Sequence, residues 1–72
     1  PKLTTPAPTL SNVDWAGTPN PTAKVSWTVD SNAGHYEVQV NTETPVTKAS
    51  GDTINLIKGE ENIVKVTAKT SD

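Results

Sequence analysis

Residues 23–29 read AKVSWTV, and this stretch decides the fold of the chain. Val25, Trp27 and Val29 alternate here with a serine and a threonine. A repeat of two residues is typical of a β-strand with one buried face, because successive side chains of a strand point to opposite faces of its sheet. The stretch therefore predicts a strand that directs its tryptophan and both valines into a core.

Two further stretches repeat this alternation. Residues 35–40 read HYEVQV and follow a run of turn residues, DSNAG, in which Asp and Asn bond their own backbone and Gly admits positive φ. Residues 62–70 read NIVKVTAKT. The inward positions that these two stretches predict are Tyr36, Val38, Val40, Val64 and Val66.

Weaker signals complete the pattern. TLSNVDW at residues 9–15 predicts a first strand, and Ile54 and Leu56 mark another as buried positions. Pro45 cannot donate to a strand ladder, so only a short edge strand over residues 46–49 is expected between them. Short strands with turn residues between them and no helical period favour an all-β sandwich or barrel.

The 72 residues form one domain, which we divide into a linker and a folded part. Residues 1–8 read PKLTTPAP, and such Pro- and Thr-rich sequence favours an extended linker. Residues 9–72 form the sandwich domain. Because the chain begins at Pro1 and not at Met, we expect a fragment of a larger protein, joined to neighbouring domains. Cysteine is absent, so stability must come from packing and strand pairing without disulfides.

Three of these stretches together resemble a known family. VSW at residues 25–27, HYEV at residues 35–38 and VKVTAK at residues 64–69 are similar, in this order, to the B-strand tryptophan, the C-strand tyrosine and valine, and the F-strand motif of fibronectin type III domains. The resemblance implies an immunoglobulin-like antiparallel β-sandwich of six to seven short strands. It also implies a use in adhesion, spacing or display.

The chain departs from that family at two places. The F strand of the family opens with a tyrosine that holds a corner of the fold, but Asn62 stands at this place, so the corner must be held differently. The sequence also stops at Asp72, where a last strand is expected. Either the sandwich is a shortened one, or the last strand comes from elsewhere. The strand around Val66 is then a free edge or accepts a partner strand, and Lys65 and Lys69 are residues that protect such edges.

Composition argues against several function classes. The net charge is -2 and the cations are dispersed lysines, which disfavours nucleic acid binding. No apolar run is long enough for membrane insertion. His35 and Glu37 are too few ligands for a metal site, and the loop carboxylates Asp30 and Asp52 lack the dense run of a calcium loop. No serine has a nucleophile elbow, so we expect neither enzyme activity nor a cofactor.

Trp15 is the one candidate ligand contact, and it has two interpretations: it packs in the core, or it is exposed and anchors a carbohydrate or a protein. The Thr-rich, Cys-free and Arg-free composition looks like the modules of bacterial surface proteins and of bacteriophage capsids or tails. We therefore expect a non-enzymatic display or adhesion module of an extracellular, cell-surface or virion protein that contacts host-cell surface proteins or glycans weakly. The alternative is a structural spacer or particle-stabilising domain without a ligand.

Overall fold

A computed structural model of the chain describes Leu3 and residues 5–70. None of the described residues is helical, and all strand pairs are antiparallel, which confirms the predicted all-β class. The strands are β1 (Thr9–Asp14), β2 (Thr22–Ser26), β3 (His35–Val40), β4 (Val46–Lys48), β5 (Thr53–Asn55) and β6 (Val64–Lys69).

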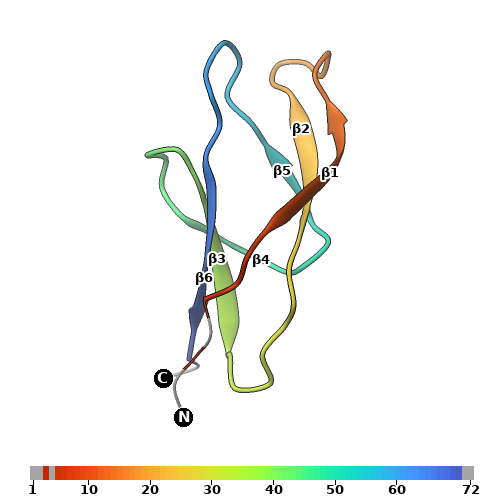
Figure 1. Ribbon diagram of the computed structural model, residues 1–72. Helices are drawn as coiled ribbons and strands as arrows, with labels where there is room; N and C mark the ends of the chain where they lie inside the picture. The colour runs from red at the N-terminus through yellow and green to blue at the C-terminus, as the bar shows by residue number, and fades with distance from the viewer. Residues whose placement is uncertain (1–2, 4, 71–72) are drawn as a thin grey trace.

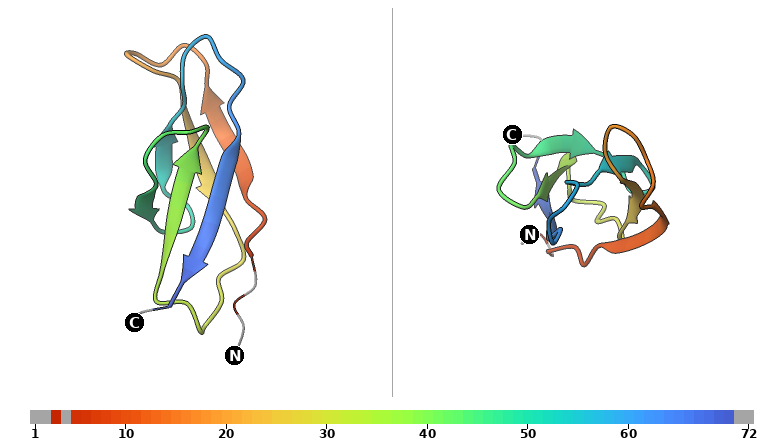
Figure 2. Two further views of the ribbon diagram at one scale, coloured as in Figure 1. Left: turned by 90° about the vertical axis from the view of Figure 1, so that its left-hand side faces the viewer. Right: turned by 90° about the horizontal axis from the view of Figure 1, so that it is seen from above.

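The strands form two three-stranded sheets, with the orders β1-β2-β5 and β4-β3-β6. Figures 1 and 2 show the sheets lying against each other as two layers of an elongated molecule, whose extents are 41 × 22 × 15 Å. The small antiparallel β-sandwich is thus confirmed, with six strands in the described part of the chain. β4, β5, β1 and β6 are the four edge strands, and only β2 and β3 are central.

The core lies between the sheets and draws on both of them. Trp27 and Tyr36 form its aromatic part, with ring centroids 5.2 Å apart. The Tyr36 hydroxyl also accepts a hydrogen bond from the Asp30 N–H, which ties the β2–β3 connection to the core. The buried apolar residues are Ala23, Val25, Trp27, Tyr36, Val38, Ile54, Leu56 and Val66. Of the remaining residues predicted as core, Val40 and Val64 are partly buried and pack against this cluster.

The prediction for Val29 is wrong, because its side chain is 66% exposed. β2 ends at Ser26, where its pairing with β1 also ends. The next residue, Trp27, is held instead by Ser50, whose hydroxyl accepts from the Trp27 N–H at 2.9 Å and donates to its carbonyl at 3.0 Å. Without a paired strand beyond this point, the alternation in the sequence no longer decides which way a side chain points. Val29 therefore lies on the surface of a loop.

Asn62 holds the corner before β6, a place for which the sequence predicted only that no tyrosine holds it. Its Oδ1 accepts from the Ile57 N–H at 2.7 Å, and its Nδ2 donates to the carbonyls of Ile57 at 3.2 Å and Glu60 at 3.1 Å. Gly59 lies inside this loop with φ +82°, a conformation that other residues rarely adopt. One amide side chain thus ties together the two sides of the β5–β6 connection.

The two ends of the described chain lie at the same end of the sandwich. β6 runs down to the lower end in Figure 1, and the segment that leads into β1 lies there too. The β1–β2 and β5–β6 connections lie at the opposite, upper end (Figures 1 and 2). Of the predicted linker, Leu3 and residues 5–8 are described and form no strand, while Pro1, Lys2 and Thr4 lie outside the described residues, as do the last two residues of the predicted domain.

Candidate functional site

The β1–β2 connection is a structured turn at its start. Asp14 ends β1, its side-chain Oδ1 accepts from the Ala16 N–H at 3.1 Å, and its carbonyl accepts from the Gly17 N–H at 3.3 Å. An aspartate that bonds the backbone two residues further on is a common device for starting a turn. Trp15 lies between the two bonded residues, so its backbone is fixed by hydrogen bonds on both sides.

Gly17 is required by close packing within the same connection. A Cβ at this position would lie 2.7 Å from the carbonyl oxygen of Asn20, a separation that real Cβ atoms do not show. The connection therefore folds back tightly on itself, and a larger residue would push its two halves apart. This constraint adds to the hydrogen bonds of Asp14 and holds the shape of the loop that carries Trp15.

The Trp15 side chain is 71% exposed, the largest exposed fraction among the large apolar residues of the described chain. This exposed fraction agrees with the interpretation in which Trp15 is exposed, and not with the one in which it packs in the core. An exposed indole offers a flat apolar face for stacking on a sugar or a side chain, and an N–H that donates a hydrogen bond. Because the backbone around it is already fixed, little loop ordering would accompany binding.

Four other large apolar side chains are exposed, and the sequence pattern singled out none of them as surface residues. Leu10 is 39% exposed and lies on the edge strand β1. Ile63 is 57% exposed and directly precedes the edge strand β6. Val29 lies in the β2–β3 connection and Val46 on the edge strand β4. Single exposed apolar residues are normal on protein surfaces and alone indicate no function.

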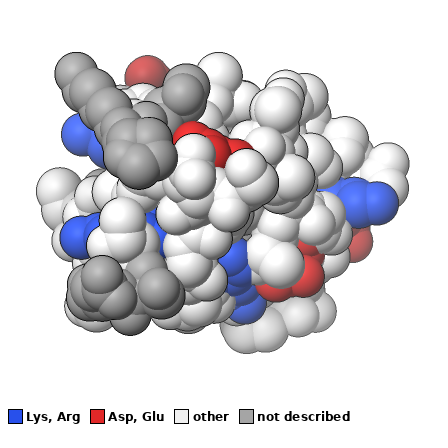
Figure 3. Space-filling view, turned by 90° about the horizontal axis from the view of Figure 1, so that it is seen from below, with Lys and Arg blue, Asp and Glu red and all other residues white. Residues whose placement is uncertain are grey.

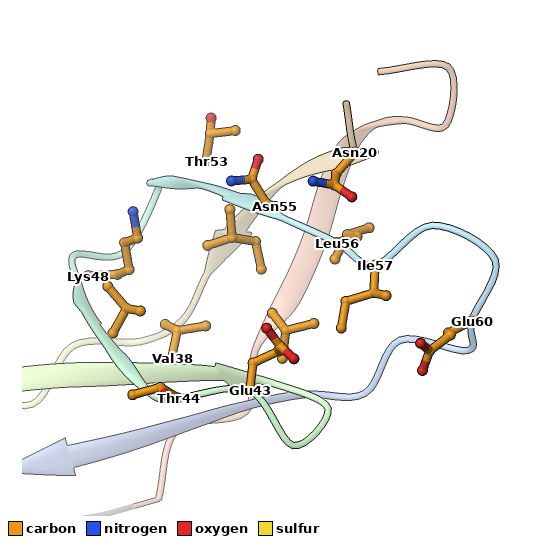
Figure 4. Close-up of a pocket in the computed structure, with 13 residues that line it drawn as sticks. Asn20, Val38, Glu43, Thr44, Lys48, Thr53, Asn55, Leu56, Ile57 and Glu60 are labelled. Carbon is orange, nitrogen blue, oxygen red and sulfur yellow. The ribbon is translucent and has the colours of Figure 1, made fainter. Parts of the chain in front are cut away.

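A cleft of about 600 Å³ opens on the opposite side of the sandwich, between β5 and the β3–β4 hairpin. Figure 4 shows Lys48 near one end of this cleft and Glu60 at the other, with Val38 on the β3 side and Leu56 on the β5 side. Val38 and Leu56 belong to the buried core, and of the other apolar residues that line the cleft only Val46 is exposed. Pockets that bind small molecules combine accessible apolar walls with a few polar groups. We therefore do not assign a ligand to this cleft.

Polar clusters give no stronger site. His35 Nε2 and Glu37 Oε2 are 3.3 Å apart on the outer face of β3. Within the described ranges, no group of three or more His, Cys, Asp or Glu side chains could hold a metal ion. Figure 3 shows acidic and basic side chains interspersed over the described part of the lower end, which carries no extended patch of one charge.

The described residues include no helix of the length and apolar character that crossing a membrane requires.

Comparison with known proteins finds no relative of this chain. No family model matches the chain, and searches of curated proteins and of solved structures find no match either.

Proposed function

We propose that this chain is a non-enzymatic display or adhesion module of a larger extracellular or virion protein, and that it contacts a glycan or a host-cell surface protein through Trp15. The observation that carries the proposal is an indole that is 71% exposed on a loop fixed by its own hydrogen bonds. Tryptophan is among the residues most often found at the energetic centre of an interface.

The placement of the loop supports display. The β1–β2 connection lies at the upper end of the molecule, about as far as the 41 Å long sandwich allows from the end where the described chain begins and finishes (Figure 1). A parent protein joined at the lower end would therefore hold the Trp15 end outward. Loops at one end of a rigid sandwich are a frequent place for binding residues.

The strand order supports the fibronectin-like reading of the sequence. In immunoglobulin-like sandwiches, the first, second and fifth strands share one sheet, and the third strand pairs with the penultimate one in the other. Here β1, β2 and β5 form one sheet, and β3 pairs with β6 in the other. We propose on this basis a fibronectin type III-like module in which β6 corresponds to the F strand.

Binding through this site is expected to be weak for one module. A tryptophan buries about 150–250 Å² when it is fully covered, well below the ~800 Å² per partner of a standard stable interface. Binding strong enough for adhesion would then require many copies on one particle or cell wall, since linked sites reach a far higher avidity than a single site.

The test compares Trp15→Ala with Val29→Ala, a matched control that removes another exposed apolar side chain from a different loop. Each variant is assayed as a multivalent display on a glycan array and on host cells. Loss of binding with Trp15→Ala alone, with unchanged circular dichroism, supports the proposal. Equal binding by both variants overturns the role of Trp15, and absence of all binding by the unmodified module favours the structural spacer instead.

A further inference from the structure

The outer edge of β6 carries backbone groups that pair with nothing in the described chain. Asn41 N–H donates to the Ile63 carbonyl at 2.8 Å, so the backbone of Ile63 faces β3. Backbone groups alternate sides along an antiparallel strand, hence Lys65 and Thr67 face β3 as well. Val64, Val66 and Ala68 therefore direct their N–H and C=O groups away from the sheet, where β6 has no neighbouring strand. Unpaired groups of this kind are a template for another strand.

The side chains along this edge follow a regular order. Lys65, Thr67 and Lys69 lie on the solvent face of β6 and are exposed, while Val66 is buried on the inner face. Just before the strand, the apolar side chain of Ile63 is 57% exposed. A partner strand must therefore place neutral or acidic residues opposite the two lysines, and an aliphatic chain near Ile63.

We propose that this edge pairs with the same edge of a second copy, antiparallel and centred on Val66. In this register Val66 faces Val66 of the second copy, and Val64 faces Ala68, so every outward backbone group of the three residues finds a partner. On the solvent face, Lys65 lies opposite Thr67 of the second copy, and Lys69 lies opposite Ile63, whose exposed side chain the lysine stem covers. The result is one sheet of six strands across both copies.

Charge selects this register over its neighbours. A shift by one pair in one direction places Lys65 opposite Lys65 of the second copy. The same shift in the other direction places Lys65 opposite Lys69, and does so twice because of the two-fold symmetry. Like charges directly opposite each other destabilise a strand pair, so both alternatives are disfavoured. Only the Val66-centred register pairs the outward backbone groups of Val64, Val66 and Ala68 and also places no lysine directly opposite another lysine.

One segment of the chain lies near this edge. Figures 1 and 2 show the segment that leads into β1 passing beside the lower part of β6. It contains Pro6 and Pro8, which have no N–H to donate, and no backbone hydrogen bond joins residues 5–8 to β6 in the described chain. Pairing with a second copy moves this segment aside without breaking a hydrogen bond to β6.

The experiment measures dimerisation of the full 72-residue chain by sedimentation equilibrium over a wide concentration range. Thr67→Glu places an acidic side chain opposite Lys65 of the second copy in two symmetric pairs, and it strengthens dimerisation by about twofold to thirtyfold. Thr67→Lys weakens it. Within one chain Thr67 lies opposite Glu37, so Thr67→Glu should destabilise the monomer and Thr67→Lys should stabilise it. A pure stability effect therefore cannot imitate the predicted result.

Ala68→Pro is a further variant, because it removes an outward N–H and leaves the bonds between β6 and β3 in place. It is expected to abolish dimerisation of a folded chain. A strictly monomeric unmodified chain whose Thr67→Glu variant is also monomeric overturns the proposal. So does protection of the Val64, Val66 and Ala68 amides from hydrogen exchange at a concentration where the chain is monomeric, since its own segment then covers the edge. These readouts do not involve Trp15 and stand apart from the binding test.

Discussion

Replacement of Asn62 by alanine tests how the β5–β6 corner is held. The side chain makes three hydrogen bonds to backbone groups, of which the two to Ile57 are part-buried and the one to Glu60 is exposed. Each buried bond contributes about 0.5–1.5 kcal/mol net, and water can replace the exposed one, so the two part-buried bonds set an expected cost of about 1–3 kcal/mol for Asn62→Ala.

That cost is large for a domain of this size. Unfolding entropy near 60 °C is about 2.1 cal/mol/K per residue, or roughly 0.15 kcal/mol/K for the whole chain, so the melting temperature should fall by about 7–20 °C. A domain of this length is expected to have a total stability of only about 4–11 kcal/mol. The loss of one amide side chain therefore removes a substantial part of it.

The measurement is urea unfolding followed by tryptophan fluorescence. Trp27 is buried beside Tyr36 and reports the transition, while Trp15 is already exposed in the folded chain. The control is Glu61→Ala, because this exposed neighbour makes no hydrogen bond to another described side chain or backbone group, and its loss should change stability by less than about 0.5 kcal/mol. Equal stability of the Asn62 and Glu61 variants would refute the assignment of the corner to Asn62.

Two further predictions use the same unfolding assay. Val25→Ala should cost about 2 kcal/mol because Val25 is fully buried, whereas Val29→Ala should stay within about 0.5 kcal/mol because Val29 is mostly exposed; similar values for both would contradict the end of the strand at Ser26. Gly17→Ala should lower stability by about 1–3 kcal/mol, since its Cβ meets the Asn20 carbonyl at 2.7 Å, and a neutral effect would show that the β1–β2 connection opens without cost.

The main strands could be predicted from the sequence because the alternation of side chains is a local property of the backbone. Val25, Tyr36, Val38 and Val66 alternate with polar residues over stretches where a strand has partners, and all four are buried. Period and burial agree there because the pleat itself sends alternate side chains to opposite faces. The class of fold follows from such stretches without knowledge of which strands are neighbours.

The alternation gave a wrong prediction for Val29 and left two interpretations of Trp15 open. The alternation that includes Val29 continues past the last paired residue of β2, and only the pairing registers with β1 and β5 reveal where the strand ends. The exposure of Trp15 depends on a turn that Asp14 closes and on the tight approach of Gly17 to Asn20. Neither contact produces a periodic sequence pattern from which it could be predicted.

By itself, the sequence determined that the chain is a small all-β sandwich without disulfides and that Trp27 and Tyr36 belong to its core. The tertiary structure alone decided that Trp15 is exposed and that Val29 leaves the core, and it shows the β6 edge, for which the sequence predicted a free or partner-accepting edge, unpaired in the described chain. The physical reason is the range of the interactions. Backbone pleating acts between neighbouring residues, whereas exposure and edge pairing depend on which distant segments cover each other.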